Sequence, residues 1–180
     1  MFKLLGKVFK TGIITDPLSK TTEVNIEKIG DRCKEIIDAK FFGSLAIRQV
    51  DAGSCNGCEL EIHALNNSFY DIERFGIHFV ASPRHADLLL VTGPVSRNME
   101  AALITAYNAT PNPKLVIAVG DCGVCGGEFG CSYASAGAVR NIIPVDATIK
   151  GCPPTPFDLL QGILQLINGE PSRNPQLGDN

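Results

Sequence analysis

The chain has 180 residues, of which 44% are hydrophobic and 19% charged, and its formal net charge is −3. This length is typical of one domain with short terminal extensions, and the hydrophobic content is sufficient for a sizeable core. The small negative charge excludes the basic field that nucleic-acid-binding proteins use, so we expect no nucleic acid among the partners. The sequence contains no run of about 18 consecutive apolar residues, which argues against a membrane-spanning helix.

Seven cysteines are the most unusual feature of the composition. The amino-terminal segment has lysines but no apolar run followed by a small-residue cleavage site, so no secretory signal is expected. Without secretion, a framework of disulfide bonds is not expected. The cysteines therefore indicate metal or redox chemistry in the cytosol.

The two ends of the chain differ in composition from its middle. Residues 1 to about 20 interleave large apolar side chains with lysines, which is typical of a short interfacial helix and equally of a frayed terminus. Residues 23–40 place isoleucines and Cys33 at helical spacing and predict an amphipathic helix with Cys33 in the core. We therefore divide the chain into an arm that contacts a membrane or a partner, a central domain and a loose tail. These parts comprise residues 1–43, 44–169 and 170–180.

The middle of the chain alternates short β-type runs with helical runs, which is typical of a parallel sheet covered by helices. The expected fold class is therefore a doubly wound α/β domain. The predicted strands are Leu45–Val50, Ile77–Ala81, Leu88–Thr92, Leu115–Val119 and Val145–Ile149.

Three further helices are expected around this sheet, each with an apolar stripe. The predicted inward residues of the helix after the first strand are Cys58, Ile62, Leu65, Phe69 and Ile72. Those of the helix at 98 to about 108 are Met99, Ala102, Leu103 and Ala106. The last helix begins at Pro156, with Thr155 as its N-cap and Asp158 in its first turn, and Gly169 ends it. Its predicted buried residues are Phe157, Leu160, Leu164 and Ile167.

Four cysteines follow the ends of three predicted strands: Cys55 and Cys58 after the first, Cys122 after the fourth and Cys152 after the fifth. In an open α/β sheet, ligands bind in the crevice beyond the carboxyl ends of the strands. The four thiols can therefore converge on one edge although they are far apart in sequence. Glycines surround each position, and they let the backbone come close and turn N–H groups toward an anionic centre.

Three kinds of site are compatible with this pattern. Four thiolates suit a zinc ion or an iron–sulfur cluster, and the chain offers two zinc-type pairs, Cys55/Cys58 and Cys122/Cys125. Their separation is long for a ribbon-type zinc site, whose spacer is about 15–20 residues. A thioredoxin-type disulfide needs a single pair and leaves the other thiols unused. A [4Fe–4S] cluster held by Cys55, Cys58, Cys122 and Cys152 uses three strand ends together, and the pattern favours it.

Four segments of the chain resemble a known family. They read "CNGCELEIHAL", "SPRHADLLLVTGPV", "GDCGVCGG" and "GCPPTP". In this order they are similar to the small, cluster-carrying subunit shared by energy-converting [NiFe] hydrogenases and respiratory complex I, and the similarity runs from about Ala46 to Ile167. It implies a flavodoxin-like fold and one [4Fe–4S] cluster next to the catalytic subunit. The ligands that it implies are Cys55, Cys58, Cys122 and Cys152.

The spacing of the first two cysteines indicates a branch of this family. The complex I homologue has two adjacent cysteines where this chain has C-x-x-C, which is the hydrogenase form. The chain thus looks like the small subunit of membrane-bound group 4 [NiFe] hydrogenases of the formate hydrogenlyase or Ech type. That resemblance implies an electron-relaying oxidoreductase subunit with no catalytic residue of its own. The alternative is the cluster subunit of a complex I-like enzyme that passes electrons from NADH or ferredoxin to quinone, or of one that reduces sulfur compounds.

The resemblance also implies partners and a location. A large subunit would hold the nickel–iron centre, because no motif in this chain resembles the two C-x-x-C pairs that bind nickel. A ferredoxin-like subunit with two [4Fe–4S] clusters would supply electrons, and membrane-arm subunits would complete the assembly. The chain is then expected at the cytoplasmic face of the cell membrane as a peripheral subunit.

Two charged residues are candidates for tuning the cluster. Glu61 matches an acidic position of the family, where it would tune the cluster or help proton movement. The alternative is a polar-face residue favoured by the helix dipole. Arg84 is expected at the same sheet edge as the cysteines, where it would raise the cluster potential or hold a partner. Its alternative is a surface pair with Asp87.

Other residues near the cysteines receive structural interpretations. Glu59 is expected to face solvent or a partner. His63 is expected to be an interface or hydrogen-bonded residue, with a redox-linked proton acceptor as the alternative. Cys125, with Cys131 nearby, is close enough in sequence to Cys122 to leave a ligand swap open.

Overall fold

The computed structural model describes residues 20–169, with side chains from Asn25 onward. The predicted interfacial arm, at residues 1 to about 20, and the predicted tail, at 170–180, lie outside the described residues. The division of the chain at residues 43 and 169 therefore stays a prediction. Within the described range, no helix combines the length and the apolar character needed to cross a membrane.

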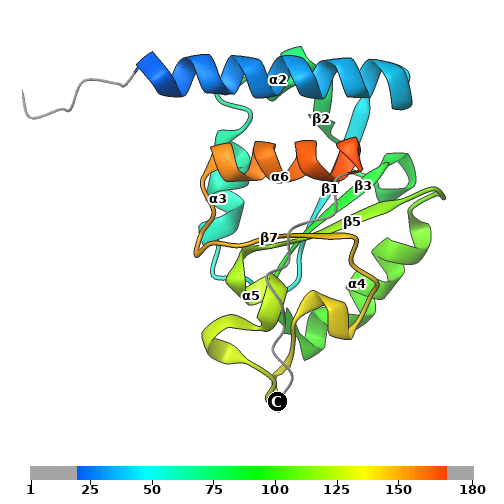
Figure 1. Ribbon diagram of the computed structural model, residues 1–180. Helices are drawn as coiled ribbons and strands as arrows, with labels where there is room; N and C mark the ends of the chain where they lie inside the picture. The colour runs from blue at the N-terminus through cyan, green and yellow to red at the C-terminus, as the bar shows by residue number, and fades with distance from the viewer. Residues whose placement is uncertain (1–19, 170–180) are drawn as a thin grey trace, which may run out of the picture.

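A sheet of five parallel strands forms the centre of the fold (Figure 1). The strands are β1 (Leu45–Asp51), β2 (Ile77–Phe79), β3 (Leu88–Thr92), β5 (Leu115–Val119) and β7 (Ala147–Ile149). They lie in the order β2-β1-β3-β5-β7, and each neighbouring pair is parallel. Because the chain winds from β1 to β2 on one side and then through β3, β5 and β7 on the other, the order is flavodoxin-like. The predicted fold class is confirmed.

Strands β3 and β5 have the predicted bounds, β1 extends one residue beyond its predicted end at Val50, and the edge strands β2 and β7 are shorter than predicted. At the start of β7, the Asp146 carboxylate accepts the N–H of Val116 at 2.8 Å, so a side chain takes the place of a strand carbonyl there. After β2 the chain turns into the short 3-10 helix η2 (Pro83–His85), where the Ser82 hydroxyl accepts the N–H of Arg84. Edge strands thus end where local hydrogen bonds compete with the ladder.

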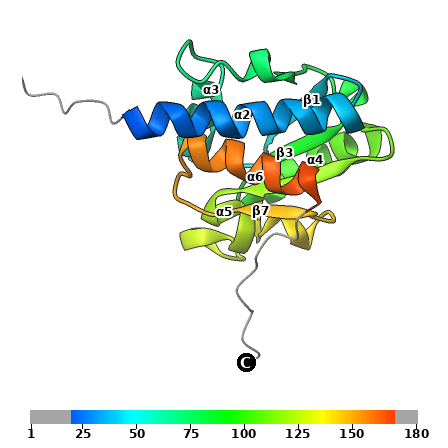
Figure 2. The same ribbon diagram turned by 45° about the horizontal axis from the view of Figure 1, so that its top comes forward.

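Helices cover both faces of the sheet. On one face lie α2 (Lys20–Lys40), α3 (Gly57–Ala64) and α6 (Pro156–Asn168), and on the other lie α4 (Arg97–Ala109) and the short α5 (Gly120–Cys125). Figures 1 and 2 show α2 and α6 side by side, and the two helices are in contact. The side chains of β3 alternate between the two cores, with Leu88 and Leu90 in the first and Leu89 and Val91 in the second.

The predicted amphipathic helix corresponds to α2. Cys33 and Ile37 are fully buried against the sheet-side core, and Ile29 and Ile36 are half-buried beside them. Burial raises the pKa of the Cys33 thiol to about 12. Cys33 is therefore a neutral core thiol, as predicted.

The two ends of α6 are as predicted. The Thr155 hydroxyl accepts the N–H of Asp158 at 3.2 Å, and the Asp158 carboxylate accepts the N–H of Thr155 at 3.0 Å, which forms a capping box. Gly169 ends the helix with a φ of 78°. The buried face differs from the prediction, because Phe157 and Leu164 are half-buried and line a groove of about 680 Å³ between α2 and α6. The buried residues of α6 are Pro156, Leu159, Leu160, Ile163 and Ile167.

The helix after β1 is shorter than its apolar stripe suggested. It ends at Ala64, because the Asn67 side-chain oxygen accepts the N–H of Phe69 at 2.8 Å and forms a local turn. Phe69 is therefore 38% exposed, and its predicted inward orientation is wrong. Ile72 is buried as predicted, but from the separate 3-10 helix η1 (Ile72–Phe75).

The remaining elements lie on the α4 side of the fold. In α4, Leu103 is fully buried as predicted, whereas Ala102 is exposed because the helix packs through a narrow stripe. A small antiparallel pair joins β4 (Val95–Ser96) to β6 (Ser135–Gly137). Two further 3-10 helices, η3 (Gly127–Phe129) and η4 (Val139–Asn141), flank β6.

Candidate functional site

The four cysteines that follow the strands come together at the carboxyl edge of the sheet. Cys55 lies in the loop after β1, Cys58 in the first turn of α3, Cys122 in α5 after β5, and Cys152 in the loop after β7. Burial, followed by the charges of Glu59 and of the other three thiols, raises the pKa of the Cys58 thiol to about 12. The other three thiols are therefore within electrostatic reach of Cys58.

The same coupling acts on Cys122. Burial raises the pKa of its thiol, and the charges of Cys152, Cys55, Asp121 and Cys125 add to this effect in that order. Thiolates this close together repel one another, so the chain without a bound cation holds Cys58 and Cys122 as neutral thiols near pH 7. Binding of a metal or cluster by these sulfurs as thiolates must therefore release protons.

The thiol group is buried on one side and open on the other. Cys58 is only 9% exposed, Cys122 is half-buried, and Cys55 and Cys152 are exposed. Because Cys58 lies in the first turn of α3, the positive end of that helix faces the group and favours an anionic occupant. The open side is accessible to a partner chain.

Local hydrogen bonds shape the loop that carries Cys55. The Asp51 carboxylate at the end of β1 accepts the N–H groups of Gly53 and Ser54 at 2.8 and 2.9 Å, and the Ser54 hydroxyl accepts the N–H of Asn56 at 3.1 Å. Asn56 is left-handed, with a φ of 71°, and precedes the first residue of α3. This sequence of turns places Cys55 and Cys58 on the same side of the strand end.

Glycines leave space beside the sulfur atoms. A Cβ atom at Gly120 would lie 2.6 Å from the Cys58 sulfur, and one at Gly127 would lie 2.6 Å from the Cys122 sulfur. Both glycines have positive φ, of 77° and 53°. A Cβ at Gly57 would lie 3.5 Å from the Cys55 sulfur. Any larger residue at Gly120 or Gly127 would therefore fill the space around the thiols.

Among residues 20–169, no group of three or more His, Cys, Asp or Glu side chains is close enough together to hold one metal ion. The four cysteines at this end of the strands are electrostatically coupled, and glycines lie beside the sulfurs of Cys55, Cys58 and Cys122. Thiolates hold zinc ions and iron–sulfur clusters in proteins, so the chemistry of this set of side chains fits either group.

Glu59 is a buried acid at this site, and its predicted orientation toward solvent or a partner is wrong. It is 5% exposed, and neither carboxylate oxygen has a hydrogen-bond partner in the described part of the chain. Because α3 packs against α6 as well as against the sheet, more of its surface is buried than the single apolar stripe predicts. The spacing of three residues between Glu59 and Ile62, which is also buried, was the available signal in the sequence.

We expect the Glu59→Gln variant to be more stable than the unmodified chain without cofactor. An unpaired buried carboxylate carries a desolvation cost that a neutral amide largely avoids, so the free energy of unfolding should rise by about 1–3 kcal/mol. Urea unfolding of the full chain measures this change. Glu61→Gln is the matched control, because it makes the same chemical change at a half-buried position of the same helix. A loss of stability in Glu59→Gln would mean that Glu59 has a partner, which contradicts the orphan carboxylate.

The two residues proposed to tune the site differ in their placement. Glu61 is half-buried in α3, and it raises the pKa of Tyr70 as a second cause after burial. Arg84 is exposed in η2, and in the described residues no ion pair joins it to Asp87, whose carboxylate instead accepts the N–H of Ala46 at 2.9 Å. The predicted surface pair is therefore wrong. The placement of Glu61 and Arg84 does not decide whether either residue tunes the site, so tuning by either residue stays a prediction.

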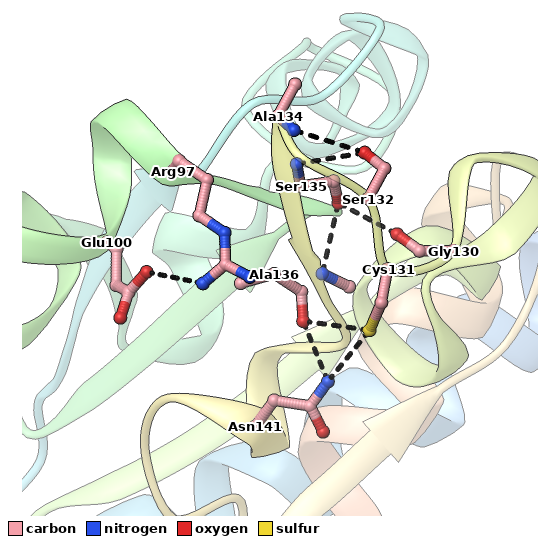
Figure 3. Close-up of polar contacts among 10 residues, drawn as sticks. Arg97, Glu100, Gly130, Cys131, Ser132, Ala134, Ser135, Ala136 and Asn141 are labelled. Carbon is pink, nitrogen blue, oxygen red and sulfur yellow. Dashed lines mark hydrogen bonds and ion pairs between the residues drawn. The ribbon is translucent and has the colours of Figure 1, made fainter.

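Cys125 and Cys131 have hydrogen bonds of their own. The Cys125 thiol donates to the Asp121 carbonyl at 3.1 Å. The Cys131 thiol donates to the Ala136 carbonyl at 3.3 Å and accepts from the Asn141 amide at 3.8 Å (Figure 3). Cys131 is thus part of a local polar network, whereas Cys125 remains near Cys122 and also contributes to its charge environment.

His63, expected to be an interface or hydrogen-bonded residue, lines a pocket beside β1 and β2. It is exposed at the end of α3, and the pocket has a volume of about 290 Å³. Arg48 of β1 and Phe79 of β2 line the same pocket. This placement fits an interface residue.

The chain matches a family model over residues 55–166, and the family is described as "NADH ubiquinone oxidoreductase, 20 Kd subunit". It is 43% identical over 167 residues to formate hydrogenlyase subunit 7 of Escherichia coli, covering 93% of this chain and 63% of that protein. It is 47% identical over 139 residues to a probable membrane-bound hydrogenase subunit of Pyrococcus furiosus, covering 73% of this chain and 83% of that protein.

Two solved structures have a similar fold. A chain of an archaeal membrane-bound sulfane sulfur reductase is 38% identical, with a TM-score of 0.61, and the match covers 69% of each chain. A chain of an NAD+-reducing [NiFe]-hydrogenase is 18% identical, with a TM-score of 0.54, and the match covers 76% of this chain and 98% of that one. The second similarity concerns the fold alone.

Proposed function

Because the chain belongs to the family of the 20 Kd subunit of NADH ubiquinone oxidoreductase, we propose that it is the electron-transfer subunit of a membrane-bound [NiFe] hydrogenase complex. Family membership confirms the resemblance that the four sequence segments indicate, and it makes the chain a subunit of an oxidoreductase. The choice of the hydrogenase branch is supported by the C-x-x-C spacing of Cys55 and Cys58. It is also supported by the similarity to hydrogenlyase and hydrogenase subunits over most of the chain.

The proposed cofactor is one [4Fe–4S] cluster held by Cys55, Cys58, Cys122 and Cys152. The observation that carries the proposal is the convergence of these four thiols, each electrostatically coupled to Cys58, at the carboxyl edge of the sheet. The space beside them, which Gly120 and Gly127 keep free of side chains, fits such a group. When bound, the cluster accepts and releases one electron at a time.

The residues of this chain have three roles in that relay. Four thiolates hold the cofactor, and the positive end of α3 offsets part of their negative charge. The buried side around Cys58 excludes water, which together with N–H groups near the sulfurs sets the reduction potential. The exposed side, around Cys55 and Cys152, is the path by which electrons leave toward a neighbouring subunit.

The elements next to the cysteines also carry exposed apolar side chains suited to a partner. Leu60, in the helix of Cys58, and Phe129, in the 3-10 helix after Cys122, are each 63% exposed. Exposed large apolar residues beside a functional site are typical of a protein–protein contact. We propose that this surface meets a large subunit that holds the nickel–iron centre.

The other proposed partners complete the electron path. A ferredoxin-like subunit with two [4Fe–4S] clusters supplies electrons to this chain, and membrane-arm subunits anchor the complex. The relatives belong to a formate hydrogenlyase, a probable membrane-bound hydrogenase and a membrane-bound sulfur reductase. We therefore place the chain as a peripheral subunit at the cytoplasmic face of the cell membrane.

A second candidate function is supported by one structural similarity and one sequence similarity. The chain shares 38% of its residues with the sulfane sulfur reductase chain over the matched region. It is also 48% identical over 110 residues to an NADH-quinone oxidoreductase chain of Herpetosiphon aurantiacus. The alternative is therefore the cluster subunit of a complex I-like enzyme that reduces quinone or sulfur compounds.

An assay of the intact complex separates these functions. The complex is purified anaerobically through a tag on this chain and supplied with reduced methyl viologen. We expect H₂ evolution that stops when the large subunit is removed. Reduction of a quinone or of polysulfide without H₂ evolution would contradict the hydrogenase proposal and support the second candidate.

A further inference from the structure

Asp121, which precedes Cys122, makes two hydrogen bonds to a single residue of the loop that carries Cys152. The N–H of Asp121 donates to the Gly151 carbonyl at 2.9 Å, and its carboxylate accepts the N–H of Gly151 at 2.9 Å. Asp121 and Gly151 are 30 residues apart in sequence. Asp121 thus joins the start of α5, which carries Cys122, to the loop that carries Cys152. Each of the two bonded residues lies one position before a cysteine.

This pair of bonds continues the pairing of β5 and β7 beyond the sheet. The last paired residues of these strands are Val119 and Ile149, and Asp121 and Gly151 lie two positions further along each strand. Gly120 interrupts β5 with a φ of 77°, so a regular ladder cannot continue through it. The Asp121 carboxylate supplies the acceptor that the strand backbone would otherwise provide.

The same pair of hydrogen bonds, made by an aspartate to one residue of the neighbouring strand, occurs twice at the amino-terminal ends of the strands. Asp146 accepts the N–H of Val116 and donates its own N–H to the Val116 carbonyl, at 2.8 and 2.9 Å. Asp87 makes the same two contacts with Ala46, at 2.9 and 2.8 Å. Aspartates therefore fasten neighbouring strands at their ends, and Asp121 is the one of these three that does so at the cysteine edge.

The charge of Asp121 does not explain its presence beside Cys122. A carboxylate next to a thiolate is electrostatically unfavourable, and its charge is among the causes that raise the pKa of the Cys122 thiol. In the described residues, no ion pair of Asp121 offsets this effect. The hydrogen bonds to Gly151 are the favourable interaction that remains.

We propose that Asp121 is a positioning residue whose carboxylate fastens the start of α5, which carries Cys122, to the Cys152 loop and so fixes the spacing of the two sulfurs. The hydrogen-bonding part of this inference stands on the contacts themselves, and the effect on the cofactor rests on the proposed function. The sequence alone does not single out Asp121, because the pairing of β5 with β7 brings its hydrogen-bond partner, Gly151, next to it.

The decisive variants separate the acceptor from the charge. Asp121→Asn keeps a side-chain oxygen that accepts the Gly151 N–H and removes the charge, whereas Asp121→Ala removes both. Asp146→Ala is the matched control, because it breaks the same kind of contact at the opposite end of the same strand pair. All three changes are made in the full chain.

The first measurement is hydrogen exchange of the Gly151 amide in the chain without cofactor. We expect at least tenfold faster exchange in Asp121→Ala, and rates within about threefold of the unmodified chain in Asp121→Asn and Asp146→Ala. Unchanged exchange in Asp121→Ala, or exchange in Asp121→Asn as fast as in Asp121→Ala, would overturn the proposal. This result does not depend on any cluster.

The second measurement is the rate at which anaerobically reconstituted chain loses iron to a chelator. Partners that orient metal ligands typically change affinity by about 10–100-fold, so we expect at least tenfold faster loss in Asp121→Ala than in Asp146→Ala. Equal rates would overturn the positioning role. If the unmodified chain binds no iron, the proposed function fails, and the exchange of the Gly151 amide still decides whether Asp121 fastens α5 to the Cys152 loop.

Discussion

We expect the Cys152→Ser variant of the full chain, reconstituted anaerobically, to retain no [4Fe–4S] cluster, and the Cys125→Ser variant to retain it. Cys152 follows its own strand and is electrostatically coupled to both Cys58 and Cys122, whereas Cys125 is coupled to Cys122 but is not among the groups that raise the pKa of Cys58. Cys125 is near Cys122, but its thiol donates to the Asp121 carbonyl. Iron content and the EPR spectrum of the reduced chain measure the outcome.

Cys131→Ser is the control for the general effect of losing an exposed thiol in this region, because Cys131 takes part in a separate network with Ala136 and Asn141. Loss of the cluster in Cys125→Ser together with its retention in Cys152→Ser would show that the ligand set is wrong. That result would place Cys125 among the ligands.

We expect the second largest effect from Gly120→Ala. The new Cβ would lie 2.6 Å from the Cys58 sulfur, so the Cys58 side chain would have to leave the position in which we propose that it binds the cluster. Gly120 also has a φ of 77°, which costs a residue with a Cβ roughly 1–2 kcal/mol. The variant should therefore lose both stability and the ability to bind iron.

Gly169→Ala separates these two effects. Gly169 has a φ of 78°, and a Cβ there would meet no atom within 4 Å. Gly169→Ala should lose only the free energy of unfolding that the positive φ costs, whereas Gly120→Ala should lose more because of the contact with the Cys58 sulfur, and only Gly120→Ala should fail to bind iron. Equal iron binding by the two variants would contradict a cluster beside Gly120.

Much of the fold could be predicted because the relevant signals are local. Two of the three interior strands, Leu88–Thr92 and Leu115–Val119, are nearly continuous apolar runs, as expected for parallel strands buried on both faces. The ends of α6 follow from the chemistry of Thr155, Asp158 and Gly169, which acts within a few residues. Positions of strand ends then sufficed to predict which cysteines share an edge.

The differences arise where packing between distant segments decides the outcome. Glu59 is buried in α3, which contacts α6, and the one trace of this burial within α3 is the spacing of three residues between Glu59 and Ile62. Phe157 and Leu164 are only half-buried because a groove separates part of α6 from α2. The end of α3 depends instead on one local hydrogen-bond acceptor, Asn67, which competes with the helix for backbone N–H groups.

The candidate site also combines features that local sequence predicts with features that depend on packing between distant segments. Residue types and spacing indicate four ligands, but the small residues that make room for a cofactor are recognisable only once their distances to the sulfurs are known. The fastening of α5 to the Cys152 loop by Asp121 likewise depends on strand pairing across 30 residues. Thiols could thus be assigned from the sequence, whereas the residues that hold them in place could not.

Metal analysis of the full chain, purified and reconstituted without oxygen, tests the central claim most directly. We expect about four iron atoms and four acid-labile sulfides per chain, as in a single [4Fe–4S] cluster, with a brown colour that disappears on exposure to a chelator. A colourless chain with one zinc ion and no sulfide would contradict this claim.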